Sequence, residues 1–243
     1  MVQYIQNRKG DLLLKKVVVL DVDDVIVDLN GRVEIEVSRK YPDFSFERVF
    51  TYDFNKSLTA ECKKLVGISE EDPWNGVGAP SEYILSKYGL VDSFRGVHLF
   101  DIPRLAELCR KCDVVFHTSG VTVDVCKFKL AYLNALLDTL GVCACVSVEL
   151  LGNMVYVNFQ DTEPQGVVDR CFVSKPALVC DFVIEDCLGN LRGYSGCRKF
   201  IVDKPWNNPT YNPSYNDVTS SSTRVANVNE AIDIILEMVE DEE

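Results

Sequence analysis

The sequence predicts an α/β protein with a parallel sheet, helices on both faces of that sheet, and a small helical cap inserted after the first strand. After residue 100, short apolar runs alternate with amphipathic helical patterns, as in βαβ units, whose strands are parallel. Residues 30–100 interrupt this alternation with a polar, aromatic-rich segment. Acidic residues follow two of the apolar runs, at the strand ends where open α/β sheets bind ligands. We therefore expect a core of residues 1–29 and 101–243 and a cap of residues 30–100.

The first strand is predicted at residues 16–21. Its centre, Val17–Leu20, is an apolar run without polar alternation, which is typical of a strand buried on both faces. Asp21, Asp23 and Asp24 follow it directly. Because a desolvated carboxylate is costly unless it is paired, acids at the end of such a strand indicate a metal ion or a reacting group.

The cap is expected to be helical. The spacing of Val33, Val37 and Tyr41 predicts a helix, although Val33, Ile35 and Val37 also alternate as they would in a strand. Further short helices are predicted at residues 56–66 and 81–89. Most cap aromatics are expected to form the cap's own core. One or two of them are candidates for stacking on a substrate base, from the set Phe44, Phe46, Phe50, Tyr52 and Phe54.

After the cap, a helix is predicted from Asp101 to Cys112, with Pro103 in its first turn. The second strand covers Asp113 to His117 and ends in Thr118, Ser119 and Gly120. The next helix carries a leucine stripe and stops at Gly141; the stripe is Leu130, Leu133, Leu137 and Leu140. A third strand at 142–150 is expected, with residues 154–159 as a candidate hairpin partner.

The fourth strand is predicted from Ala177 to Ile184 and ends in Glu185 and Asp186, with Lys175 just before it. Asp181, at the start of this strand, is expected to be structural, because it lies several residues from the catalytic edge. A fifth strand follows at Lys199–Val202, and a Ser/Asn/Pro-rich loop at 207–224. The last helix is predicted to begin at an Asn229 cap and to bury its apolar face, which is Ile232, Ile235 and Val239.

Composition limits the classes of partner. The net charge is −12, and without a basic stripe we expect no nucleic-acid polymer as a partner. No apolar run reaches the roughly 20 residues of a membrane span, and the first residues lack the apolar core of a signal peptide. We therefore expect a cytoplasmic protein that does not bind membranes. A homodimer is compatible with these observations.

Ten cysteines are present, and we expect them to be free, mostly buried thiols. A zinc site is the alternative, because Cys109 and Cys112 have CxxC spacing and Cys143 and Cys145 lie farther along the chain. Against it, Cys109 and Cys112 close a predicted helix while the other two lie in a predicted strand, an arrangement that seldom converges on one tetrahedral ion.

Polar groups at the ends of the predicted strands resemble the motifs of the haloacid dehalogenase (HAD) superfamily in type and order. They are Asp21 and Asp23, then Thr118, then Lys175, then Glu185 and Asp186. Three segments resemble the 5'(3')-deoxyribonucleotidase branch more closely: DVDDVIVDLNGR at 21–32, the stretch from Lys175 to Asp186, and DKPWN at 203–207. The resemblance implies a HAD-like Rossmannoid core with a cap after the first strand.

The resemblance also implies a mechanism. Asp21 would be the nucleophile that forms an aspartyl-phosphate, and Asp23 the general acid and then the base. Thr118, Ser119 and Gly120 would bind the phosphate, and Lys175 would neutralise charge. Phe50 is the cap residue expected to contact substrate. Mg²⁺ would be held by Asp21, the Asp23 carbonyl and Asp186, with Glu185 as a direct or water-mediated alternative.

We therefore expect a Mg²⁺-dependent phosphomonoesterase, and a deoxyribonucleoside monophosphate as its substrate. A sugar phosphate or other small metabolite is the alternative substrate, and a catalytically degenerate binding protein is the alternative function. Two departures from the family pattern bear on this choice: Asp24 stands where Gly is usual, and Glu185 begins an acidic pair that is usually Asp-Asp.

Plainer roles remain open for several of these residues. Asp24 would be a solvated turn residue or a cap, Thr118 a helix N-cap, and Lys175 an exposed loop lysine. His117 is expected to be a packed strand residue, and Trp206 an anchor of its loop.

Overall fold

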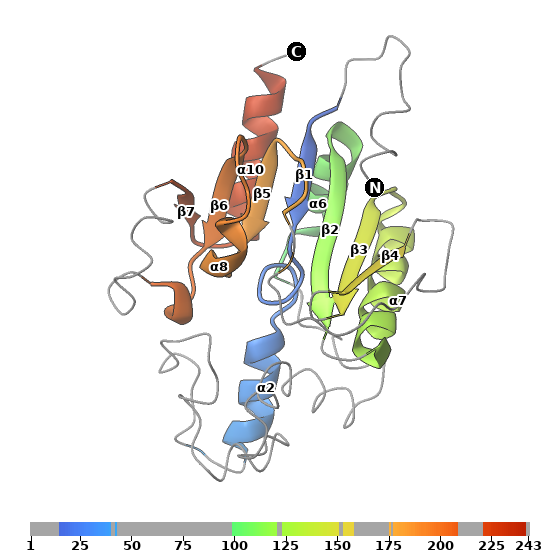
Figure 1. Ribbon diagram of the computed structural model, residues 1–243, viewed down its shortest axis with the longest axis vertical. Helices are drawn as coiled ribbons and strands as arrows, with labels where there is room; N and C mark the ends of the chain where they lie inside the picture. Colours follow the sequence, from blue (N-terminus) through green and yellow to red (C-terminus); the bar gives the residue numbers. More distant parts are fainter. Residues whose placement is uncertain are drawn as a thin grey trace.

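The computed structural model contains a seven-stranded sheet in the order β4-β3-β2-β1-β5-β6-β7 (Figure 1). The structure describes residues 15–39, 42, 99–120, 123–150, 153–157, 175, 177–208 and 221–241. The strands are β1 (Val17–Leu20), β2 (Asp113–Gly120), β3 (Cys145–Leu150), β4 (Asn153–Val157), β5 (Phe182–Glu185), β6 (Arg198–Val202) and β7 (Thr223–Val225). Neighbouring strands are parallel except β3 and β4, which form an antiparallel hairpin. The predicted α/β class with a parallel sheet is confirmed.

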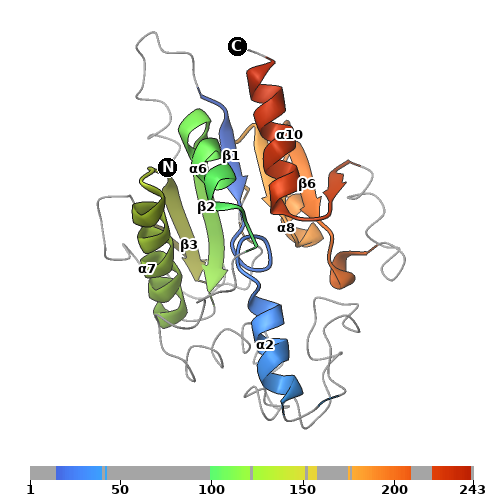
Figure 2. The ribbon, with the colours of Figure 1, turned by 180° about the vertical axis from the view of Figure 1, so that it is seen from behind.

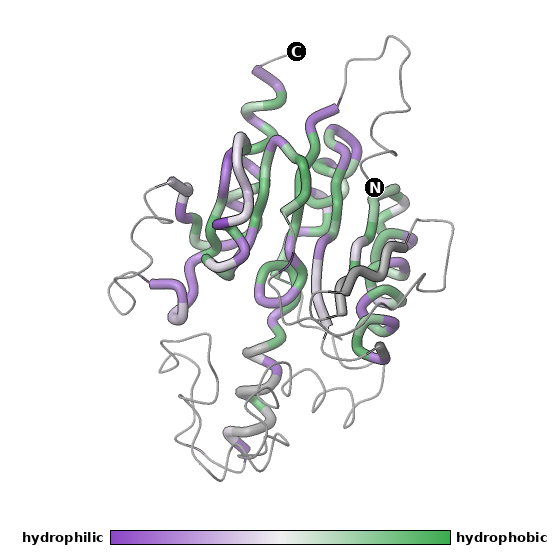
Figure 3. The backbone as a smooth tube through the Cα atoms, viewed as in Figure 1, coloured by the Kyte–Doolittle hydropathy of each residue, from purple (hydrophilic) through white to green (hydrophobic). Residues whose placement is uncertain are grey.

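Helices lie on both faces of the sheet, in unequal number. The helices α6 (Ile102–Lys111), α7 (Val123–Leu140) and α10 (Val228–Glu240) cover one face, whereas the short α8 (Leu188–Leu191) lies on the other (Figures 1 and 2). The larger apolar core lies beneath the three long helices. A smaller core lies beneath α8 and includes Val19, Val183 and Leu191. The central strands are accordingly hydrophobic over most of their length, and β2 becomes polar toward its carboxyl end (Figure 3).

The helix α2 (Leu29–Ser38) projects beyond the carboxyl ends of the strands (Figure 1). It begins at Asp28, whose Oδ1 accepts the backbone N–H of Gly31 at 3.0 Å, as an N-cap side chain does. The chain returns to the core beside this point, since the backbone N–H of Leu99 donates to the carbonyl of Ile26 at 3.0 Å. The helix predicted around residue 33 is confirmed over this range. The helices predicted at 56–66 and 81–89, and Phe50, lie outside the described residues.

Most predicted core elements are confirmed, including the hairpin of β3 and β4 and the leucine stripe on α7. Leu130, Leu133 and Leu137 are buried, and Gly141 ends the helix with a φ of 63°, a conformation that costs glycine little. The described part of the chain adds three elements that the sequence pattern did not predict: α8, the edge strand β7 and the 3-10 helix η2 (Pro205–Asn207). All three are short, and none carries a run long enough to show a period.

The start of the fourth strand was predicted too early. β5 begins at Phe182 rather than Ala177. The residue just before the strand, Asp181, makes two hydrogen bonds with Val17, one of them through its side chain. The Val17 N–H donates to Asp181 Oδ2 at 2.8 Å, and the Asp181 N–H donates to the Val17 carbonyl at 2.9 Å. These contacts give Asp181 the structural role expected of it.

The predicted cap of the last helix was also wrong. Asn227 is the N-cap of α10, and its side chain accepts the N–H groups of Asn229 and Glu230 at 3.0 and 3.2 Å. Asn229 instead joins α10 to the start of α6, because its Oδ1 accepts the Asp101 N–H at 2.7 Å. The buried face of α10 is as predicted, with Ile232, Ile235 and Val239 in the core.

The cysteines that the structure describes are free thiols. Cys109 and Cys112 are buried, and burial raises their pKa values to about 12 and about 11. Within the described ranges, the one group of side chains arranged to hold a metal ion consists of acids rather than cysteines. Among the same residues, no helix has the length and apolar character needed to cross a membrane.

Candidate active site

The turn after β1 places its acids at the carboxyl edge of the sheet. The Asp21 N–H still bonds to the neighbouring strand, donating to the Ile184 carbonyl at 3.0 Å. The chain then turns tightly, and the N–H groups of Ile26 and Val27 each donate to the Val22 carbonyl at 3.0 Å. Asp24 takes a left-handed conformation with a φ of 57°, which Asp tolerates better than most residues. The turn therefore holds the acids against the end of the sheet.

Asp24 is buried, with 4% of its surface exposed. The expectation of a solvated turn residue was wrong, because the turn folds inward and brings the Asp24 charge near Asp186. Asp24 therefore adds negative charge to the site.

Lys175 lies at the centre of the acidic cluster. Its Nζ donates to Asp21 Oδ1 at 2.6 Å and to the His117 carbonyl at 2.9 Å, and pairs with Glu185 Oε1 at 2.5 Å. The lysine is buried, so the alternative of an exposed loop lysine was wrong. Burial alone would lower the pKa of Lys175, but Asp21 and Glu185 together raise it well above that of a free lysine. Its side chain is therefore a fixed positive charge beside Asp21.

The two acids after β5 have different surroundings. Glu185 Oε1 contacts Lys175 and accepts from Asn190 Nδ2 at 3.0 Å, and its Oε2 accepts the Cys187 N–H at 3.3 Å. Both oxygens of Glu185 are thus engaged by protein groups. Burial, followed by the charge of Asp21, raises the pKa of Glu185 to about 8.

Asp186 keeps one oxygen without a partner. Trp206 Nε1 donates to its Oδ2 at 2.9 Å, and Asn207 Nδ2 donates to its backbone carbonyl at 2.8 Å. Its Oδ1 is buried and has no hydrogen-bond partner. Burial, then Asp21 and Asp24, raise the pKa of Asp186 well above its usual range. A buried polar atom without a partner is rare, and this one lies where ligand oxygens of Asp21, Glu185 and Asp186 are within 4.8 Å of one another.

A second buried lysine in the site was not predicted from the sequence. Lys129, on α7, is 2% exposed. Its Nζ contacts Asp23 Oδ2 and the Ser119 carbonyl, and it donates to Thr118 Oγ1 at 3.2 Å. One feature of the sequence could have indicated that Lys129 is buried. It lies between Phe128 and Leu130, which are both core residues, on a helix whose buried side faces the sheet.

Asp23 and Thr118 meet at Lys129. Burial raises the pKa of Asp23 above its usual value, although Lys129 lowers it in part. A carboxyl group with a raised pKa is suited to give and take a proton near neutral pH. Thr118 is fully buried within β2, and is therefore not the N-cap of α7.

Gly120 ends β2 where α7 passes close by. A Cβ atom at this position would lie 2.8 Å from Cys126 Sγ, so only glycine fits here without a shift. The structure therefore brings together Asp21, Asp23, Thr118, Lys175, Glu185 and Asp186, with Ser119 and Gly120 at the end of the same strand as Thr118. His117 is a packed strand residue with its Nδ1 3.3 Å from the Tyr194 hydroxyl, and Trp206 anchors its loop to Asp186, as expected.

Comparison with known proteins gives structural similarity alone. No protein-family model matches the chain, and a search of curated protein sequences found no match. The chain is similar to a solved haloacid dehalogenase-like hydrolase from Burkholderia xenovorans, with 12% identity, a TM-score of 0.48, and coverage of 90% of this chain and 98% of the other. A haloacid dehalogenase-like hydrolase from Streptococcus pneumoniae has 10% identity and a TM-score of 0.43, with 91% and 98% coverage.

The HAD-hydrolase YfnB from Bacillus subtilis, solved bound to magnesium, has 13% identity and a TM-score of 0.42, with 92% and 99% coverage. At identities and TM-scores this low, the similarity is not evidence for a function of this chain. A function for this chain therefore depends on the geometry of the site itself.

Proposed function

We propose that this chain is a HAD-type, Mg²⁺-dependent phosphomonoesterase. The observation that supports this most strongly is the cluster of Asp21, Lys175 and Asp186 at the carboxyl edge of the sheet. Asp21 Oδ1 lies 2.6 Å from a buried lysine, and Asp186 next to it carries a buried oxygen without a partner. A nucleophilic carboxylate, a fixed cation and an available metal ligand are the groups that phosphoryl transfer through an aspartyl-phosphate uses.

The donor set fits a hard divalent cation. The site has two buried lysines, Lys129 and Lys175, and more acids than lysines. Four of the acids are buried and Asp23 is partly exposed; the buried ones are Asp21, Asp24, Glu185 and Asp186. Such an excess of buried carboxylates is unfavourable without a counter-ion. Oxygen donors suit Mg²⁺. Asp21 and Asp186 would hold the ion, while Glu185 is engaged with Lys175 and Asn190. When bound, Mg²⁺ would neutralise charge on the phosphoryl oxygens.

The protein residues can carry the chemical steps. Asp21 attacks the phosphorus atom, and the phosphoryl group transfers to its carboxylate as the ester oxygen leaves. Asp23 gives that leaving oxygen a proton, which its raised pKa makes available. Asp23 then takes a proton from a water molecule that attacks the aspartyl-phosphate, and inorganic phosphate leaves. Lys175 and Lys129 offset the negative charge on either side of the reacting group.

The substrate class we propose is a nucleoside monophosphate, and within it a deoxyribonucleoside monophosphate. The support is the resemblance to the 5'(3')-deoxyribonucleotidase branch, which includes the DKPWN segment. In the structure Trp206 and Asn207 of that segment both bond to Asp186. The segment therefore belongs to the site rather than to a distant loop.

Phosphate release from a panel of compounds tests the proposal. The panel contains deoxyribonucleoside and ribonucleoside monophosphates and sugar phosphates, each with Mg²⁺ or with EDTA, and Asp21→Asn is assayed in parallel. We expect release that depends on Mg²⁺, is greatest for the nucleotides, and is abolished in Asp21→Asn. The same substitution at the exposed Asp138 is the control and should leave the rate unchanged.

Two outcomes would change the proposal. Release from sugar phosphates alone would retain the chemistry and reject the nucleotide substrate. Undiminished release by Asp21→Asn, or by the wild type in EDTA, would refute the mechanism itself.

A further inference from the structure

Two free thiols lie at the amino ends of neighbouring strands, at the edge of the sheet opposite the candidate active site. Cys180 precedes β5 and Cys197 directly precedes β6. Both are partly buried, and both pack against the small apolar core beneath α8. Neither has a part in the proposed catalysis, and the inference that follows does not depend on that proposal.

The backbone brings the two cysteines together. β5 and β6 are parallel, with Phe182 opposite Arg198, and the Arg198 N–H donates to the Asp181 carbonyl at 2.8 Å. Cys180 and Cys197 are the residues adjacent to this bond, and their thiol groups are hydrogen-bonded to each other. Continuing the register back by one residue places Asp181 opposite Cys197, so Cys180 lies one position away on the neighbouring segment. With about 4.8 Å between strands and about 3.3 Å per residue, this diagonal is within the range of about 4.4–6.8 Å that Cα atoms of disulfide-bonded cysteines span, and both cysteines pack against the same small core.

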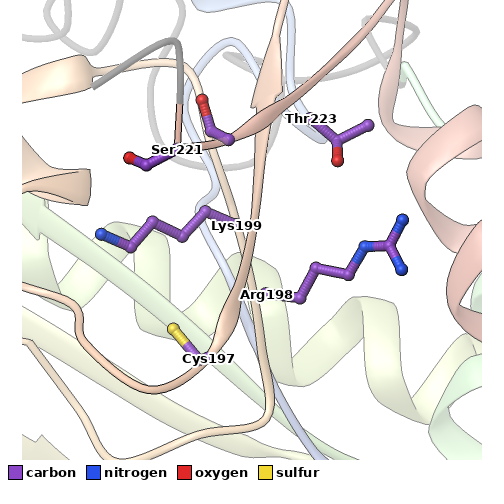
Figure 4. Close-up of a pocket in the computed structure, with 6 residues that line it drawn as sticks. Cys197, Arg198, Lys199, Ser221 and Thr223 are labelled. Carbon is purple, nitrogen blue, oxygen red and sulfur yellow. The ribbon is translucent and has the colours of Figure 1, made fainter. Parts of the chain in front are cut away.

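Cys197 is also reachable by a small molecule. It lines an open pocket of about 430 Å³ between the β6 and β7 segments, whose other lining residues are Arg198, Lys199, Ser221, Ser222 and Thr223 (Figure 4). Lys199 and Cys197 lie on the same side of β6, and Arg198 extends to the other side (Figure 4). In a chain with a net charge of −12, Lys199 places one positive charge on the same side as Cys197, which favours an anionic reagent over a cationic one.

The pair of cysteines with CxxC spacing differs in this respect. Cys109 and Cys112 lie at the end of α6 and are 6% and 1% exposed. Buried thiols of this kind are inert, because reagents cannot reach them. Of these two pairs, the one at β5 and β6 is therefore the pair that a reagent can reach.

We propose that Cys180 and Cys197 are a redox-active pair that forms a reversible disulfide with a small anionic disulfide reagent such as oxidised glutathione. The Cys197 thiolate attacks one sulfur of the reagent, which forms a mixed disulfide and releases one glutathione thiolate. The Cys180 sulfur then attacks the Cys197 sulfur, and the second glutathione leaves. The two thiol protons end on the two glutathione molecules, which are reduced as the cysteine pair is oxidised.

The bond would close a loop that carries part of the candidate site. Residues between 180 and 197 include β5, Glu185, Asp186 and α8, and Lys175 lies just ahead of it. Closing a loop reduces the freedom of the unfolded chain. The oxidised protein should therefore have a higher Tm than the reduced protein.

The test is to treat the folded, reduced full-length protein with oxidised glutathione, count free thiols, and map the disulfide by fragment mass spectrometry. We expect the loss of at least two thiols, a single linkage between Cys180 and Cys197, a raised Tm, and reversal by dithiothreitol. Cys180→Ser and Cys197→Ser should each abolish the linkage, and Cys197→Ser should also prevent the mixed disulfide. Cys143→Ser, which changes an exposed cysteine, should leave all four results unchanged.

Three results would overturn the proposal. They are an unchanged thiol count in the wild type, a linkage between other cysteines, and a Cys180–Cys197 linkage that forms only after the protein is denatured. Because none of these readouts is an activity, failure of this proposal and failure of the phosphatase proposal are distinguishable.

Discussion

At the scale of single residues, the site depends on two buried lysines that reach it from different parts of the chain. Lys175 holds Asp21 and Glu185, and Lys129 holds Asp23 and Thr118. Each lysine therefore fixes one of the two aspartates that the proposed chemistry uses. A buried charge placed in advance stabilises developing charge without reorganisation.

Replacing Lys129 tests whether this second cation contributes to catalysis. Lys129→Met keeps the side chain's length and apolar packing and removes its charge, so we expect phosphate release to fall by about 10²-fold or more. Lys127→Met is the matched control, since Lys127 is exposed on the same helix, and it should retain the wild-type rate. Circular dichroism and Tm would show that both variants are folded. A wild-type rate in Lys129→Met would remove the lysine from the mechanism.

Lys129 is a site residue that could not be predicted from the sequence. Asp21, Asp23, Thr118, Lys175, Glu185 and Asp186 could be proposed as site residues because strand ends meet at one edge of a parallel sheet. Lys129 lies in the middle of an amphipathic helix, and its contact with Asp23 spans 106 residues. Which polar residue on a helix turns inward depends on the rotation of the helix against the sheet, which local periodicity does not define finely enough.

At the scale of elements, the strands that the sequence predicts best are those buried on both faces. β1, β2 and β6 carry continuous apolar runs, and they were predicted within a few residues of their ends. β5 was predicted too early because the apolar residues before it extend the same pattern. The boundary is set instead by the bonds between Asp181 and Val17. Short elements such as α8 and β7 depend on tertiary contacts and leave no periodic signal.

The start of α10 provides a test at this scale. Asn227 accepts two N–H groups of the first turn, so Asn227→Ala should lower the free energy of unfolding by about 1 kcal/mol. Asn227→Ser retains an acceptor and should restore most of that loss. Urea unfolding measures both. An unchanged midpoint in Asn227→Ala would show that the cap contributes nothing, as would an equal loss in both variants.

At the scale of the whole molecule, the candidate metal ligands connect the two halves of the sheet. Asp21 follows β1, and Asp186 follows β5 and is held in turn by Trp206 and Asn207. A cation bound between them would join elements that are far apart in the sequence. Because the unfolded chain has no such site, metal binding should add to the stability of the fold.

We therefore expect Mg²⁺ to raise the Tm of the wild type and EDTA to reverse the rise. At a Mg²⁺ concentration 100 times Kd, the gain would be about 2.7 kcal/mol, or about 5–10 °C for a protein of this size. Asp186→Asn should lose most of the shift, whereas Asp138→Asn should keep it. Trp206 fluorescence should change during the same titration, since its indole bonds to Asp186. Equal shifts in Asp186→Asn and the wild type would place the ion elsewhere.

The central claim is that Asp21 becomes phosphorylated during turnover, and trapping with borohydride tests it most directly. Borohydride reduces an aspartyl-phosphate to homoserine, so the protein would be quenched while it hydrolyses its best substrate and then mapped by mass spectrometry. We predict homoserine at position 21 alone, only when substrate is present, and none in Lys175→Met, which loses the cation paired with Asp21. Steady phosphate release with position 21 unmodified, or with another acid reduced in its place, would contradict the account.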